Sequence, residues 1–245
     1  MFDYLANPTR FRAITAVIFP VAMAVTVAAL IYGLYLAFFA SPADYQQGET
    51  VRIMYIHVPA AWMALLAYLA MAIAAIFYLV WRHPLADIGA RAMAVPGASF
   101  ALITLLTGSF WGRPMWGTWW VWDARLTSML ILFFLYLGYI ALADGFDRPE
   151  RGSKPASLLL IVGVINLPII KFSVDWWNTL HQGSSVLRFG GPSIDPAMLL
   201  PLLIMALAML GWFICVSILR MNTLLAQRRL TALEARGYSP QRGKA

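Results

Sequence analysis

The chain contains a single cysteine, Cys215, and therefore cannot form a disulfide within itself or a Cys-x-x-Cys pair for thiol redox chemistry. Charged residues are also scarce, at 12% of 245 residues, whereas soluble domains contain about 25%. Glycine-rich nucleotide-binding loops and the His-Glu-x-x-His motif are absent. Work driven by a nucleotide would therefore require a partner protein, and we expect the chain not to be an enzyme.

Apolar residues are abundant instead, at 61% of the chain with a mean hydropathy of +0.72. Several runs reach the ~20 apolar residues that a helix needs to cross a bilayer, and barrel-type alternation is absent. The first run follows Arg10 and Arg12 and is too long for a cleaved signal peptide. We predict an all-α polytopic membrane protein, a single domain over 1–245. Six spans are expected, at about 13–40, 58–81, 92–110, 127–143, 157–173 and 197–219.

The net charge of +7 is distributed as membrane topology requires, which argues against a nucleic-acid partner. Thirteen of the eighteen lysines and arginines lie in the termini and in alternate connections, so both termini are expected in the cytoplasm of a bacterial inner membrane. The segments 41–57, 111–126 and 174–196 then face outward. The basic tail, 220–245, is either a topology signal or a segment that lies against anionic lipid.

The densest polar feature is the segment 111–128, WGRPMWGTWWVWDARLTS, which we call the tryptophan segment. It contains five tryptophans: Trp111, Trp116, Trp119, Trp120 and Trp122. Two or three would be an ordinary interfacial belt, but five favour a flat apolar wall. Gly112, Pro114 and Gly117 predict a break in the helix and a re-entrant shelf. If the later part is helical, Trp116, Trp119, Trp120 and Asp123 can share one face.

Three histidines are the remaining candidates for chemistry. His83, among cytoplasmic arginines, is interpreted as an interface residue. His57 lies at or just before the start of the second span, where Pro59 suits a first helical turn. For His181 we expect a short outer helix begun by Asp175, on which Trp177 and His181 share a face.

The two outward histidines flank the tryptophan segment, one in each neighbouring outer segment. Two imidazoles and a flat apolar wall describe a non-covalent b-type haem site, with His57 and His181 as axial iron ligands. Zinc would usually need three or four ligands. An arginine would suit the haem propionates. Arg125 can meet a ligand carboxylate or pair with Asp123, and the other outward arginines are Arg52, Arg113 and Arg188.

Together these residues resemble a known family. The tryptophan segment is similar to the WWD signature of a haem-handling superfamily, and MYIHVPAAW and WWNTLHQG resemble the heme exporter protein C family of cytochrome c maturation. The resemblance covers nearly the whole chain. It implies that haem is held at the outer, periplasmic face for a haem chaperone, CcmE. It also implies an ABC-type pair, CcmA and CcmB, and a small membrane protein, CcmD.

The same resemblance implies roles for particular residues. His57 and His181 match the family's axial haem ligands, and 111–128 matches its haem platform and chaperone-contact surface. Two alternatives remain open from the residues: a membrane cytochrome b subunit that transfers electrons, and a permease or scaffold subunit without haem. A bis-histidine electron-transfer haem would more typically be ligated from within the helix bundle.

Overall fold

The computed structural model describes residues 7–235 and 237, apart from 182, 184, 187 and 189. Within this part of the chain every regular element is helical. The elements are α2 Pro8–Tyr35, η1 Leu36–Ala40, η2 Glu49–Ile53, α3 Met54–Trp81, α4 Pro84–Trp116, α5 Ala124–Asp144, α6 Pro149–Gly163, α7 Asn166–Trp176 and α8 Pro196–Glu234.

The predicted count of membrane spans is confirmed for these described residues. Six helical stretches are long and apolar enough to cross a membrane, and the chain is a multi-pass membrane protein. The spans are longer than hydropathy alone predicts: α4 extends to Trp116 rather than 110, and α8 to Glu234 rather than 219. The last ten residues of the predicted basic tail, except 237, lie outside the described residues.

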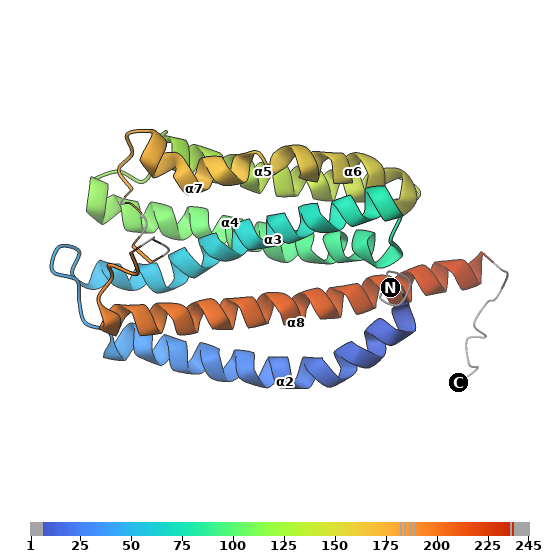
Figure 1. The fold of residues 1–245 in the computed structure, drawn as a ribbon, viewed down its shortest axis with the longest axis horizontal. Helices are drawn as coiled ribbons and strands as arrows, with labels where there is room; N and C mark the ends of the chain where they lie inside the picture. Colours follow the sequence, from blue (N-terminus) through green and yellow to red (C-terminus); the bar gives the residue numbers. More distant parts are fainter. Residues whose placement is uncertain are drawn as a thin grey trace, which may run out of the picture.

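The helices run side by side along the long axis of the molecule (Figure 1). α3 packs along α4, α8 packs along α2, and α5 packs against α6 and α7. The connections 41–48 and 117–123 and the described residues of 177–195 lie together at one end of the bundle, which we call the loop end. The first described helix begins, and α8 finishes, at the opposite end (Figure 1). An even number of spans produces this arrangement.

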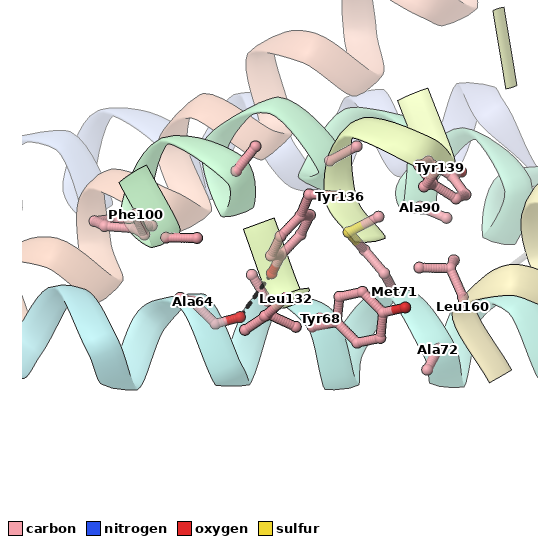
Figure 2. Close-up of a cluster of buried hydrophobic side chains, with 14 of the residues drawn as sticks. Ala64, Tyr68, Met71, Ala72, Ala90, Phe100, Leu132, Tyr136, Tyr139 and Leu160 are labelled. Atoms are coloured by element: carbon pink, nitrogen blue, oxygen red, sulfur yellow. Dashed lines mark hydrogen bonds between the residues drawn. The ribbon is translucent and has the colours of Figure 1, made fainter. Parts of the chain in front are cut away.

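The centre of the bundle is packed with small residues and a few large side chains from α3, α4, α5 and α6 (Figure 2). Alanines on α3 allow close helix approach, as is typical of membrane helix interfaces. Tyr136 of α5 is fully buried, and its hydroxyl donates a hydrogen bond of 2.6 Å to the carbonyl of Ala64. Its ring contacts Tyr68 edge-on. These two contacts join α5 to α3 within the core.

The fifth span is broken into α6 and α7 near Val164. Pro168 has no N–H to donate to the carbonyl of Val164, so the helical ladder is interrupted there. Asn166 begins α7 and donates from Nδ2 to the carbonyl of Ser128 on α5, at 2.8 Å. This contact satisfies a buried amide and connects α7, which precedes His181, to the start of α5.

Candidate functional site

A cavity of about 320 Å³ lies at the loop end. Ligand pockets typically measure about 300–1,000 Å³, so this one is large enough for an organic ligand. His57 and His181, the two histidines predicted to face outward, both line it, as do three of the five tryptophans of the tryptophan segment. Its functional lining comprises His57, His181, Trp111, Trp116, Trp120, Arg125, Lys171, Gln46 and Gln47. The structure therefore brings His57 and His181, separated by more than one hundred residues in sequence, to one cavity, and their role as ligands stays a prediction.

His57 lies in the first turn of α3 and not before it, because the short helix η2 leads directly into α3 at Met54. Residues on one face of α4 contact the imidazole ring of His57. His57 Nδ1 lies 3.0 Å from the hydroxyl of Thr107, and Trp111, one turn later, contacts the ring edge-on at 5.7 Å between centroids. Gly108 lies between these two, and a methyl group there would sit 3.0 Å from His57 Cε1.

His181 is held by the end of the tryptophan segment. Its Nδ1 lies 3.2 Å from Asp123 Oδ2, and its ring contacts Trp116 at 4.8 Å between centroids. Thr179 donates to the same Asp123 oxygen and accepts from the backbone N–H of His181 at 3.1 Å. Asp123 also caps α5, because its Oδ1 accepts from the N–H of Leu126 at 2.8 Å. One carboxylate therefore orients both a helix and an imidazole.

The protonation of this pair follows from burial and hydrogen bonding. Burial lowers the pKa of His181 below its ordinary value, and the neighbouring Asp123 only partly offsets this effect. Burial raises the pKa of Asp123, but the N–H of Leu126, the hydroxyl of Thr179 and His181 together bring it below its ordinary value. At neutral pH the site therefore contains a neutral imidazole beside an ionised carboxylate.

The same contacts select one tautomer for each histidine. Asp123 is ionised and accepts only, so His181 Nδ1 carries the proton. The hydroxyl of Thr107 donates to the carbonyl of Ile103 at 2.6 Å, and accepts from His57 Nδ1. Each ring therefore keeps its Nε2 lone pair as a ligand donor. Metal-ligating histidines are typically oriented in this way by a partner on the other nitrogen.

The structure separates the five tryptophans into two groups. Trp111, Trp116 and Trp120 line the cavity. The indole N–H of Trp120 is buried and meets no acceptor among the described residues, so it can donate to a ligand. In contrast, Trp119 and Trp122 are 54% and 76% exposed and form part of the outer surface of the loop end. Trp177 is likewise half exposed.

The predicted local structure of the segment was wrong in one respect. α4 continues through Gly112 and Pro114 and ends only at Gly117, whose φ of +76° favours glycine. Residues 117–123 are not helical, so the expected shared helical face of Trp116, Trp119, Trp120 and Asp123 does not exist. Pro114 is tolerated because it lies near the helix end, close to the surface.

The predicted outer helix that begins at Asp175 was also wrong. α7 ends at Trp176, and Asp175 is in its last turn. Trp177 is extended, so Trp177 and His181 do not share a helical face. The turn formed by Thr179 and its contact with Asp123 positions His181 instead.

Four arginines were predicted to face outward, and of these Arg125 lines the cavity. It donates to Ser173 Oγ at 3.2 Å and to the carbonyl of Lys171 at 3.3 Å, and Asp123 is engaged with other donors. Arg52 is bound to Glu49 and donates to the carbonyl of Ala37. Arg113 donates to the carbonyl of Gly117. Arg188 is exposed.

His83 and Cys215 lie apart from the cavity lining. His83 precedes α4 at the end of the bundle opposite the loop end, and Cys215 is buried within α8. In the described part of the chain, no cluster of three or more His, Cys, Asp or Glu side chains is placed to hold a bare metal ion. Two imidazoles are a fitting donor set for haem, whose ring already supplies four nitrogens to the iron.

Sequence reasoning missed the residues that orient the two histidines. Thr107 and Gly108 precede the tryptophan segment and carry no motif by themselves; only their helical spacing from Trp111 hints at a shared face. Thr179 is in the quoted WWNTLHQG stretch, but its role depends on a contact with Asp123, 56 residues away. Gln47 was not predicted either, although it lines the cavity.

Comparison with known proteins places these features in a family. The family model described as "CcmC: Heme exporter protein C" matches residues 1–236. Heme exporter protein C of Bradyrhizobium diazoefficiens is 55% identical over 230 residues, which cover 94% of this chain and 87% of that protein. Heme exporter protein C of Escherichia coli K12 is 51% identical over 198 residues, covering 81% and 80%.

A plant protein shows the same similarity. The "Putative cytochrome c biosynthesis ccmC-like mitochondrial protein" of Marchantia polymorpha is 54% identical over 169 residues, which cover 69% of this chain and 71% of that protein. The match to the family model spans the six-helix bundle, including both cavity histidines and the whole tryptophan segment. The chain therefore belongs to the heme exporter protein C family.

Proposed function

We propose that the chain holds non-covalent b-type haem at the loop end and presents it to a CcmE-like haem chaperone during cytochrome c maturation. The observation that carries this proposal is the convergence of His57 and His181 on one cavity, each with Nδ1 engaged and Nε2 available. When bound there, haem would supply an iron with four ring nitrogens. The chain's residues would supply the two axial positions and the surrounding wall.

Several cavity residues fit the remaining parts of haem. Trp111 and Trp116 support the two histidines with aromatic surface. The buried N–H of Trp120 and the guanidinium of Arg125 are donors that suit propionate carboxylates. Trp119 and Trp122 are exposed beside the cavity, and we infer that they contact the chaperone. Aromatic residues of this kind are enriched at protein interfaces.

We infer that the loop end faces the periplasm. The basic connections and the described part of the basic tail lie at the opposite end, which the positive-inside rule assigns to the cytoplasm. A site at the ends of the spans, not at mid-bilayer, favours transfer of the ligand to another protein. The proposal includes CcmA and CcmB as the ABC-type pair, because nucleotide-binding motifs are absent from this sequence. It includes CcmD as the small membrane partner because the family resemblance implies it.

The test is a visible spectrum of the protein purified from haem-replete cells. We expect a Soret band in the wild type, and its perturbation in both His57→Ala and His181→Ala. His83→Ala is the matched control, because His83 lies at the opposite end of the bundle and should leave the spectrum unchanged. A wild-type protein without a Soret band would refute haem binding. Unchanged spectra in both cavity variants would refute the ligand assignment. Rapid reduction of the haem by quinol without chaperone loading would instead favour an electron-transfer subunit.

A further inference from the structure

The connection 41–48 forms a turn whose shape is set by its own hydrogen bonds. Asp44 Oδ1 accepts from the backbone N–H groups of Gln46 and Gln47, at 2.9 and 2.8 Å. Asp44 and Gly48 also pair through their backbones, and Gly48 has a φ of +56°, which favours glycine. Thr50 donates to the carbonyl of Gln47 at 2.7 Å. The backbone of Gln47 is therefore positioned independently of its side chain.

The side chain of Gln47 reaches into the candidate site. Its Oε1 accepts a hydrogen bond of 2.9 Å from the indole N–H of Trp111. Trp111 in turn contacts His57 edge-on, with an angle of 76° between the rings. Trp111 is only partly buried, and a directed hydrogen bond restricts its rotamer. The contacts thus run from Gln47 through Trp111 to His57.

We propose that Gln47 is a positioning residue for haem binding: it holds the Trp111 indole against His57 and so makes the 41–48 turn a wall of the site. The inference rests on the proposed function, because it concerns the same cavity. Gln47 acts through Trp111 and not on the iron. Its contribution should therefore disappear when the indole N–H is removed.

The experiment is a double-mutant cycle on the full-length protein in detergent, with haem affinity measured from the Soret absorbance. Gln47→Leu removes the acceptor and retains most of the volume, and Trp111→Phe removes the donor. Loss of one hydrogen bond should weaken haem binding about three- to tenfold in either single variant. The double variant should bind haem no less tightly than whichever single variant has the lower haem affinity. Gln47→Glu retains an acceptor and should bind haem better than Gln47→Leu.

A second readout uses haem-free protein that contains 5-fluorotryptophan. The ¹⁹F resonance absent from Trp111→Phe is assigned to Trp111, and it should shift in Gln47→Leu. Tyr45→Leu is the control: Tyr45 lies in the same turn, is 90% exposed and does not line the cavity, so it should change neither the Trp111 resonance nor haem affinity.

The outcomes separate the two proposals. A wild-type protein that binds no haem would refute the proposed function and this inference together. Haem binding in the wild type with unchanged affinity in Gln47→Leu, or with strictly additive effects of Gln47→Leu and Trp111→Phe, would refute this inference alone. An unshifted Trp111 resonance in Gln47→Leu would also refute it.

Discussion

Replacing Asp123 with asparagine should weaken haem binding without destabilising the helix bundle. The carboxylate has two separable roles: Oδ1 caps α5 through the N–H of Leu126, and Oδ2 accepts from His181 Nδ1. Asparagine is about as good a cap as aspartate, so the first role survives. The second does not, because an amide N–H₂ placed at Oδ2 is a donor. It would favour the opposite tautomer of His181, with the proton on Nε2 and no lone pair for iron.

The expected loss of haem affinity can be estimated from other histidines that bind metals. Loss of a partner that orients a metal-ligating histidine typically costs about 10–100-fold in metal affinity. At 1.36 kcal/mol per tenfold change, this corresponds to about 1.4–2.7 kcal/mol of haem-binding free energy. Asp123→Ala should lose a similar amount of haem-binding free energy. It should also lose about 1 kcal/mol of folding stability, because the α5 cap is removed.

The assay is haem titration of the detergent-solubilised protein by Soret absorbance, with thermal unfolding of the haem-free protein measured in parallel. Asp175→Asn is the control, since Asp175 is an exposed acid in the last turn of α7. Wild-type affinity in Asp123→Asn would show that Asp123 does not select the His181 tautomer. A fall in affinity accompanied by an equal fall in stability would show that Asp123 is only a cap.

Three further predictions concern the same structure. Gly108→Ala should weaken haem binding several-fold because the His57 ring must move by a few tenths of an ångström. Gly89→Ala should not, because the added methyl would make only an ordinary contact, 3.9 Å from Met221 Cε; equal affinities would refute the close contact at Gly108. In the haem-free protein, the pKa of His181 measured by NMR should lie below the ordinary histidine value of 6.5, because burial lowers it. The ring should therefore become protonated only in more acidic solution, and a measured pKa above 6.5 would contradict this. Tyr136→Phe should lower stability by about 0.6 kcal/mol, the average for membrane-buried hydrogen bonds, measured by thermal unfolding in detergent; an unchanged stability would mean that its hydrogen bond to α3 contributes nothing.

Hydropathy was sufficient to predict the class of fold. Motif composition singled out His57 and His181 as candidate ligands, and that role stays a prediction. The requirement that a chain satisfies its backbone polar groups inside lipid leaves few architectures for a sequence that is 61% apolar. Span count depends on run length, which is a local property, and it was confirmed. Span boundaries were less well predicted, because helices such as α4 and α8 continue beyond their apolar runs into polar residues.

The local conformation of the polar segments could not be read in the same way. Glycine and proline favour a break, but Pro114 was accommodated near the end of α4 and only Gly117 ended the helix. Asp175 is a residue type that often caps the start of a helix, yet it falls at the end of α7 because this helix begins earlier, after the break near Val164. In both cases the local preference of one residue did not decide where the helix begins or ends.

By itself, then, the sequence determined a six-span helical membrane protein with two histidines and a tryptophan-rich segment at one end. Only the tertiary structure decided how these parts are arranged: that Thr107 and Asp123 each contact a histidine Nδ1, that Trp119 and Trp122 are exposed, and that Gln47 accepts a hydrogen bond from Trp111. The physical reason is that tautomer, ring orientation and exposure depend on contacts between residues far apart in sequence. Composition and spacing carry no information about such contacts until the helices are packed.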